Sequence, residues 1–119
     1  MAQIIITITR DDPTKEWLRV NTPELQAIYF TQTEIDEIIE PYKVLLASMP
    51  GFVQIRTKFP DENTMTLNYT FDTLEHAQTA RSELSTTDPE TLPGKHKKLF
   101  TDLRNKLGLN YTFEYAVIE

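Results

Sequence analysis

Two histidines, five tyrosines and a row of carboxylates are the side chains whose chemistry is easiest to assign in this sequence. His76 and His96 are the only histidines, and histidine is the usual general base near neutral pH. Neither has a second group at a spacing typical of a catalytic pair, and His96 stands in a basic run. We therefore expect surface histidines, with a catalytic role as the alternative.

The acidic side chains do not predict a metal site. Glu34, Asp36, Glu37 and Glu40 fall within one expected helix, where they suit the positive end of the helix dipole. No histidine stands among them, and a metal site needs three or four converging ligands. The chain also lacks cysteine, a phosphate-binding glycine loop and a Gly-x-Ser-x-Gly element. We expect no metal and no cofactor.

Composition narrows the class of protein. A chain of 119 residues predicts a single domain, residues 1–119. A net charge of −6 argues against a general nucleic-acid binder and against adhesion to an anionic membrane. We find neither a secretory signal nor an apolar run long enough to span a bilayer. The sequence therefore predicts a cytoplasmic protein without nucleic-acid or membrane partners.

The stretch from Gly51 to Leu84 predicts a β-hairpin that leads into a helix. Apolar and polar residues alternate over Val53–Phe59 and again over Met65–Phe71, and Pro60–Asn63 has turn composition. One register places all the apolar residues on one face. Its pairs are Phe59 with Met65, Thr57 with Leu67, Ile55 with Tyr69, and Val53 with Phe71.

Two further strands are expected at the ends of the chain. Ile4–Thr9 is rich in β-branched residues, and its isoleucines at even positions share one face. Tyr111–Val117 alternates in the same way, with Tyr111, Phe113, Tyr115 and Val117 on the apolar side. The opposite side of all four strands is polar and rich in threonine.

Three helices are expected between the strands. Thr31–Glu34 fits a capping box before an apolar helical pattern that reaches Met49, with Pro41 expected to kink or restart that helix. Asp72 is expected to cap a second helix that ends near Leu84. The third helix is basic and covers Lys95–Leu107, with Gly108 as its stop. Its basic residues are interpreted as a solvated face, with an anion site as the alternative.

The remaining segments are expected to be irregular. Residues 11–31 form an insertion in which a short helix through Leu25 and Ile28 is one alternative. Trp17 within it is interpreted as a core or interface anchor, with ligand stacking as the alternative. Ser85–Gly94 has the composition of a loop, so a loop and an extra helix occupy about 85–108.

This order of elements predicts an α+β fold of the ferredoxin-like βαββαβ type with an extra C-terminal helix. The connection rules give an antiparallel four-stranded sheet in the order 4-1-3-2, with the helices on one face. The other face is left uncovered. It displays no aromatic residue, which argues against the RNA-recognition module that shares this order of elements.

A helix ending at Pro50-Gly51, a hairpin and the segment Phe71-Asp-Thr-Leu-Glu-His-Ala77 resemble the antibiotic biosynthesis monooxygenase family and its dimeric α/β-barrel relatives. The resemblance covers about Thr33 to Leu84. It implies two sheets packed face to face in a dimer, with a pocket between sheet and helices in each subunit. Some members oxidise polycyclic phenols without a cofactor, and others degrade haem using an Asn, a Trp and a His. Here Phe71 stands in place of the Trp and Arg81 in place of the His, so haem degradation is not expected.

Two functions remain open. The first is a small enzyme, of the cofactor-free monooxygenase type, that acts on a hydrophobic or phenolic small molecule. The second is a non-catalytic oligomeric module. A pocket of several hundred Å³ between sheet and helices would favour the first function, and a fully packed core the second. The residues expected at such a pocket are Tyr42, Asn68, Tyr69, His76 and Tyr115.

The uncovered sheet face predicts a homodimer, with a monomer as the alternative. Its residues are short and β-branched, so two such faces can approach closely and hydrogen-bond, partly through water. The threonines concerned are Thr7, Thr9, Thr66, Thr70 and Thr112. Ile5, Ala116 and Ile118 supply an apolar patch on the same side.

Overall fold

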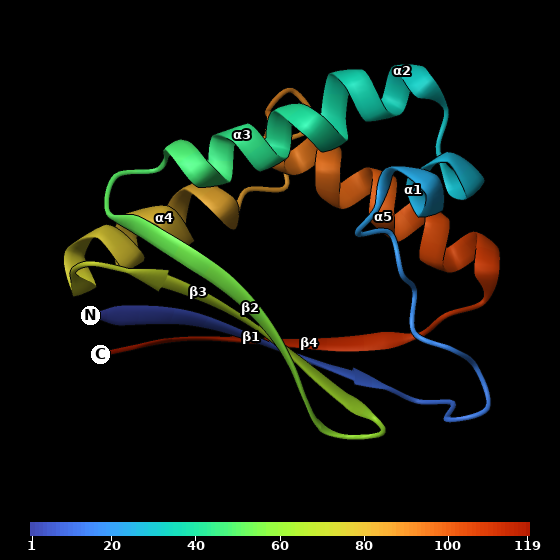
Figure 1. Ribbon diagram of the computed structural model, residues 1–119, viewed down its shortest axis with the longest axis horizontal. Helices are drawn as coiled ribbons and strands as arrows, with labels where there is room; N and C mark the ends of the chain where they lie inside the picture. The colour runs from blue at the N-terminus through green and yellow to red at the C-terminus, as the bar shows by residue number, and fades with distance from the viewer.

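The computed structural model describes residues 1–119 as an α+β structure in which helices cover one face of a four-stranded antiparallel sheet (Figure 1). The strands are β1 (Ala2–Arg10), β2 (Phe52–Asp61), β3 (Thr64–Phe71) and β4 (Tyr111–Ile118). Their order across the sheet is β2-β3-β1-β4, as expected from the sequence. The isoleucine-rich strand β1 lies inside the sheet, and because it pairs antiparallel with β4 the two chain termini lie side by side (Figure 1).

The helices all lie on the same side of the sheet (Figure 1). They are α1 (Pro23–Tyr29), α2 (Gln32–Glu34), the π-helical segment η1 (Ile35–Ile39), α3 (Glu40–Ser48), α4 (Leu74–Leu84) and α5 (Leu92–Leu107). The segments α2, η1 and α3 follow one another without a break and form a single long element. None of the helices is both long enough and apolar enough to cross a membrane.

The centre of the β2–β3 hairpin has the expected register, with Ile55 opposite Tyr69 and Thr57 opposite Leu67. The expected pair of Val53 with Phe71 is wrong, because Phe52 pairs with Phe71 and Val53 is an extra residue at a register shift. A second shift lies between Lys58 and Asp61, so Phe59 and Pro60 together face one residue of β3. A proline cannot donate to the ladder, which explains why the strand is irregular there.

The caps of α2 and α4 differ in how well the sequence predicted them. At Thr31 the expected capping box is confirmed: its hydroxyl accepts from the Glu34 N–H at 3.1 Å, and the Glu34 carboxylate accepts from the Thr31 N–H at 2.9 Å. The expected cap at Asp72 is wrong. Thr73 caps α4 by accepting from the His76 N–H at 3.2 Å, because the chain is still extended at that residue.

Pro41 restarts the helix through a widened turn. Its ring would clash with the carbonyl four residues earlier in a regular α-helix. The residues before it form η1, in which the Glu40 N–H donates to the Ile35 carbonyl, five residues back. Pro41 then lies in the first turn of α3, where its missing N–H is not needed.

Helix α5 begins three residues earlier than expected. Leu92 and Pro93 were assigned to a loop, but Thr91 caps the helix by accepting from the Gly94 N–H at 3.2 Å, and Pro93 occupies the first turn. Gly108 ends the helix with a left-handed φ of 70°, as predicted. A side chain at Gly94 would collide with the Asp88 carbonyl, so this glycine allows a close approach of loop and helix.

The insertion 11–31 contains one short helix, α1, capped by Thr22. Trp17 packs at 5.2 Å from Tyr111 and at 6.1 Å from Phe59, measured between ring centroids. The Arg10 guanidinium lies 5.1 Å from the centre of the Trp17 ring. The insertion is thereby attached to β4 and to the far end of the hairpin, which agrees with the anchor interpretation of Trp17.

The apolar core consists of two separate clusters. The larger one joins β1, β3, α3 and α4, and its buried members are Ala2, Ile4, Leu46, Met49, Phe71, Ala77, Ala80 and Leu84. The smaller one lies between η1, α5 and the insertion, and its buried members are Phe30, Ile35, Ile39 and Leu103. The space between the two clusters and the sheet is only partly filled by side chains.

Candidate ligand-binding cavity

A cavity of about 520 Å³ lies between the sheet and helices α3, α4 and α5. Fourteen of its twenty lining residues are hydrophobic, so its environment is mainly apolar. Its floor is the helix-facing side of the sheet, formed by Ile4, Ile6, Ile8, Met65, Leu67, Tyr69, Tyr111, Phe113 and Tyr115. Leu18 and Val20 of the insertion close one end, where the Leu18 N–H donates to the Tyr111 hydroxyl at 3.1 Å.

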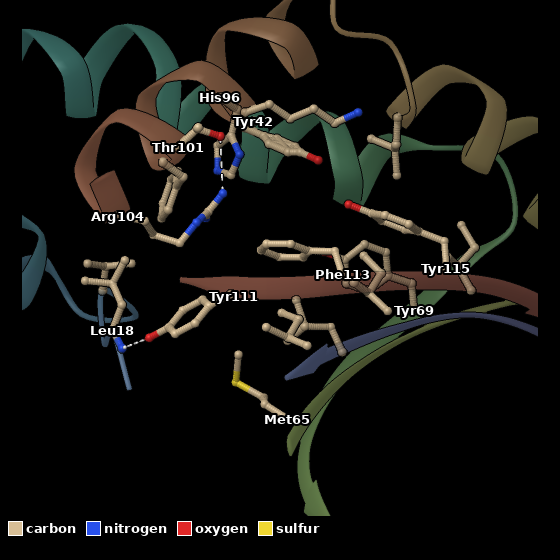
Figure 2. A pocket seen from close by; sticks show the side chains of 18 of the residues that line it. Leu18, Tyr42, Met65, Tyr69, His96, Thr101, Arg104, Tyr111, Phe113 and Tyr115 are labelled. Carbon is tan, nitrogen blue, oxygen red and sulfur yellow. Dashed lines mark hydrogen bonds between the residues drawn. The ribbon is translucent and has the colours of Figure 1, made fainter. Parts of the chain in front are cut away.

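The helix side of the cavity carries most of the polar groups. Figure 2 shows Tyr42, His96, Thr101 and Arg104 reaching from the helices toward the aromatic side chains of the strands. The regular alternation of β3 and β4 brings every second side chain to this face. The helices contribute side chains at four-residue intervals, as in His96, Phe100 and Arg104.

His96 sits inside an aromatic cluster. Its ring is 4.4 Å from the Phe100 ring in a stacked arrangement and 3.8 Å from the Tyr42 ring in an edge-on arrangement. Burial, with a smaller contribution from the nearby Arg104 charge, lowers the pKa of His96 to about 4. The imidazole is therefore neutral at physiological pH and offers one ring nitrogen as a hydrogen-bond acceptor.

Two tyrosines of the cavity, Tyr42 and Tyr69, remain protonated near neutral pH. Burial raises the pKa of Tyr69 to about 12, with a smaller contribution from Tyr115. Burial also raises the pKa of Tyr42, again with contributions from the neighbouring phenols. These hydroxyl groups can donate a hydrogen bond to a bound molecule but do not act as anions near neutral pH.

Three cationic side chains line the cavity: Arg81 of α4, and Lys97 and Arg104 of α5. The Arg81 guanidinium lies 4.3 Å from the centre of the Tyr115 ring. The Arg104 guanidinium lies 4.8 Å from the centre of the Phe113 ring and donates to the Thr101 hydroxyl at 3.2 Å. Aromatic faces attract such cations and hold them at the edge of an apolar space.

Of the residues expected at a pocket, the structure brings together Tyr42, Tyr69 and Tyr115. Asn68 does not line the cavity, because it lies between two cavity-facing residues of β3 and points to the opposite face. There its amide donates to Gln3 at 3.2 Å. His76 does not line it either: it lies in the first turn of α4, with its ring 2.6 Å from the Asp72 carboxylate.

His96, Lys97 and Arg104 were expected on the surface, and for these cavity-lining residues that interpretation is wrong. A signal was present in the sequence. His96, Phe100 and Arg104 recur every fourth residue, so the two polar residues share a helical stripe with a large aromatic residue. The many positive charges of the same helix favour a solvent-exposed face instead, because a run of like charges is usually solvated.

No protein-family model matches this chain, and no curated protein matches it either. The assignment of function therefore depends on the geometry of the cavity and on the chemistry of its lining.

Proposed function

We propose that the protein binds a small organic molecule, largely apolar and aromatic in character, in the cavity between its sheet and its helices. The observation that carries this proposal is the cavity itself, with a volume of about 520 Å³ and a mainly hydrophobic lining. Ligand sites commonly have volumes of about 300–1,000 Å³ and combine an apolar wall with a few polar groups. A fully packed core, in contrast, would leave no room for a ligand.

Filling the cavity tests the proposal. Leu67 lies on its floor, whereas Gln78 lies on the exposed side of α4, outside the cavity. We expect Leu67→Trp to abolish the fluorescence enhancement of the neutral dye N-phenyl-1-naphthylamine, and the control Gln78→Trp to preserve it. If the wild-type protein does not enhance the fluorescence of this dye, or if the two variants behave alike, the proposal is wrong.

A catalytic role of the cofactor-free oxygenase type is favoured by one specific observation. His96 lines the cavity as a neutral imidazole, so its free ring nitrogen can accept a hydrogen bond from the hydroxyl of a phenolic ligand. The nearby Arg104 charge would stabilise the negative charge that develops on the phenol oxygen as the proton shifts along this hydrogen bond. Some members of the family that the sequence resembles oxidise polycyclic phenols without a cofactor.

Measurement of oxygen consumption distinguishes a cofactor-free oxygenase from a non-catalytic binding module. We expect the purified, metal-free protein to consume oxygen with a polycyclic phenol such as 1-naphthol, and His96→Gln to lower the rate while dye binding persists. His76→Gln makes the same change outside the cavity, so it is the matched control and should keep the wild-type rate. Dye binding without oxygen consumption over a panel of phenols would favour the binding module.

We further propose that the fold is ferredoxin-like and that two copies pair through the uncovered sheet face into an α/β barrel. The support is that this face has no helix over it, while Ala116 and Ile118 are exposed on it. Asn68 lies on the same face, and its buried carbonyl oxygen has no hydrogen-bond partner within the chain. A second copy would supply both apolar contact and a donor for that oxygen.

Sedimentation tests the dimer. The wild-type protein should sediment at about twice the chain mass of 13.8 kDa. Asn68→Glu would bring two like charges together across a two-fold axis, so this variant should sediment as a monomer. The control Gln78→Glu makes the same charge change on the exposed side of α4 and should stay dimeric. A wild-type protein that is monomeric at micromolar concentration contradicts the proposal.

A further inference from the structure

The charged residues around the cavity have a single sign. Arg81, Lys97 and Arg104 line it, and no aspartate or glutamate does. The chain as a whole has the opposite balance, with 18 acidic and 12 basic residues. A cavity that gathers only cations on an acidic protein has a local potential suited to a negatively charged molecule.

None of these three cations takes part in an ion pair. The ion pairs of the structure are Lys43 with Glu40, His76 with Asp72, and Lys98 with Asp102. The cavity cations have neutral partners instead. Arg81 lies against a tyrosine ring, Arg104 against a phenylalanine ring and a hydroxyl, and the Lys97 ammonium donates to the Thr86 carbonyl at 3.0 Å. Their charges are therefore not neutralised by the protein.

Partial burial makes these unneutralised charges costly. Desolvation lowers the pKa of Lys97, and repulsion from the Arg81 charge lowers it further. Desolvation also lowers the pKa of Arg104. An anion bound between them would offset both the desolvation and the repulsion, as charged groups in a partly dry site require a partner.

We infer that the ligand of this cavity is an organic anion whose negative charge is stabilised by the surrounding charges of Arg81, Lys97 and Arg104. The apolar body of the ligand lies against the sheet, over residues such as Ile6, Leu67 and Phe113. The protonated hydroxyls of Tyr42 and Tyr69 add donors and no competing negative charge. This inference rests on the proposed function, since it specifies the class of molecule that the same cavity accepts.

A matched pair of dyes tests the charge. The probes are 8-anilino-1-naphthalenesulfonate and N-phenyl-1-naphthylamine, which share their aromatic rings and differ in the sulfonate. We expect the wild-type protein to bind the sulfonate at least about tenfold more tightly than the neutral dye, because charge-assisted hydrogen bonds are about twice as strong as neutral ones. The preference should weaken in high salt to the extent that the cations keep contact with solvent.

Charge-removing variants locate the binding groups. Lys97→Gln and Arg104→Gln should each weaken binding of the sulfonate about tenfold and leave the neutral dye within about twofold. Lys106→Gln removes an exposed charge from α5 outside the cavity and should change neither affinity. Arg104→Lys keeps the charge and should retain most of the preference, which makes it the variant of choice if Arg104→Gln does not fold by circular dichroism.

The outcomes separate the inference from the proposed function. Equal binding of both dyes to the wild-type protein, or sulfonate binding that Lys97→Gln and Arg104→Gln leave unchanged, overturns the anion assignment while the cavity remains a binding site. Sulfonate binding that survives Leu67→Trp means that this dye binds elsewhere, and it also overturns the assignment. Failure of both dyes contradicts the proposed function, and the inference falls with it.

Discussion

Helices α4 and α5 meet the same sheet in different ways. α4 packs directly on β1, β3 and β4, whereas α5 packs on α3 and η1 and makes no comparable contact with a strand. The side chains explain the difference. α4 presents Ala77 and Ala80, both buried, so its backbone can approach the sheet closely. α5 presents His96, Phe100 and Arg104, which are too long for such an approach.

In this molecule the length of the side chains between a helix and the sheet decides whether that space is filled or left open. Under α4 the core is filled, with Phe71 completely buried at 0% exposure. Under α5 the long side chains hold the helix away from the sheet, and the cavity lies beneath them. The two parts of the molecule should therefore respond differently to the same change, with the larger loss of stability in the filled part.

Truncation of a phenylalanine should give the largest difference in stability between the filled and the open region. We expect Phe71→Ala to lower the free energy of unfolding by about 3–5 kcal/mol, because it removes a large ring from a filled core. Phe113→Ala, at the edge of the cavity, should cost about 1–2 kcal/mol because its ring is only partly buried. Urea denaturation measures both values. Equal losses would mean that the two regions are packed alike.

Enlargement of a side chain should give the second-largest difference in stability between the two regions. Ala80→Leu would force extra carbons between α4 and the sheet, and we expect a loss of about 1–3 kcal/mol in the free energy of unfolding. Leu67→Phe extends into the cavity, where space is present, and should change that free energy by less than about 1 kcal/mol. If Ala80→Leu is tolerated as well as Leu67→Phe, α4 does not depend on its small residues.

The sequence predicted the strands and their order because alternation of apolar and polar residues reports directly on the two faces of a sheet. Alternation also places Tyr69 and Tyr115 on the helix-facing side, where the resemblance implies a pocket, and both residues line the cavity. The capping box at Thr31 was predictable because its atoms lie within four residues of one another. These features depend on local chemistry, so one sequence is enough to find them.

The parts that could not be predicted depend on contacts between distant segments. The bulge at Val53 depends on how the hairpin meets the end of β3, and alternation alone favours the regular register. The buried position of His96 depends on the packing of α5 against Tyr42 of α3, far away in the chain. The distance between α5 and the sheet, and hence the cavity, cannot be read from the pattern of one helix.

The pH dependence of stability should report on the open region. The pKa of His96 in the folded protein is about 4, below its ordinary value of 6.5, so the unfolded chain binds a proton more readily between these values. The contribution of His96 to the free energy of unfolding is therefore fully present above pH 6.5 and is lost as the pH falls toward 4. Tyr42 and Phe100 pack against the ring, and Arg104 is the nearby charge that repels its protonated form.

We expect the wild-type protein to lose about 1–2 kcal/mol of stability over this range through His96, an amount moderated by the water that reaches the ring. His96→Gln cannot take up this proton, so its stability should fall less steeply between pH 6.5 and 4.5. Urea denaturation of both proteins at several pH values measures the difference. Parallel pH profiles would show that His96 is as accessible to protons in the folded chain as in the unfolded one.

Removal of a helix cap should lower stability equally in the two regions. The Thr73 hydroxyl accepts from the His76 N–H and caps α4, and the Thr91 hydroxyl accepts from the Gly94 N–H and caps α5, both at 3.2 Å. Each bond is made within four residues, so its strength should not depend on whether the helix lies on a filled core or over a cavity. Thr73→Ala and Thr91→Ala should each cost about 1 kcal/mol in the free energy of unfolding, while serine at either position should restore most of the loss.

A much larger loss for Thr91→Ala would contradict this expectation and would change the comparison. The first turn of α5 includes Pro93 and Gly94, both buried, and Thr91 also donates to the Asp88 carbonyl at 2.7 Å. If this end of α5 held the helix at its distance from the sheet, loss of the cap would let the helix settle toward the strands. Dye affinity would then fall together with stability in Thr91→Ala but not in Thr73→Ala. Unchanged dye affinity in both variants would instead assign the spacing of α5 to its long side chains alone.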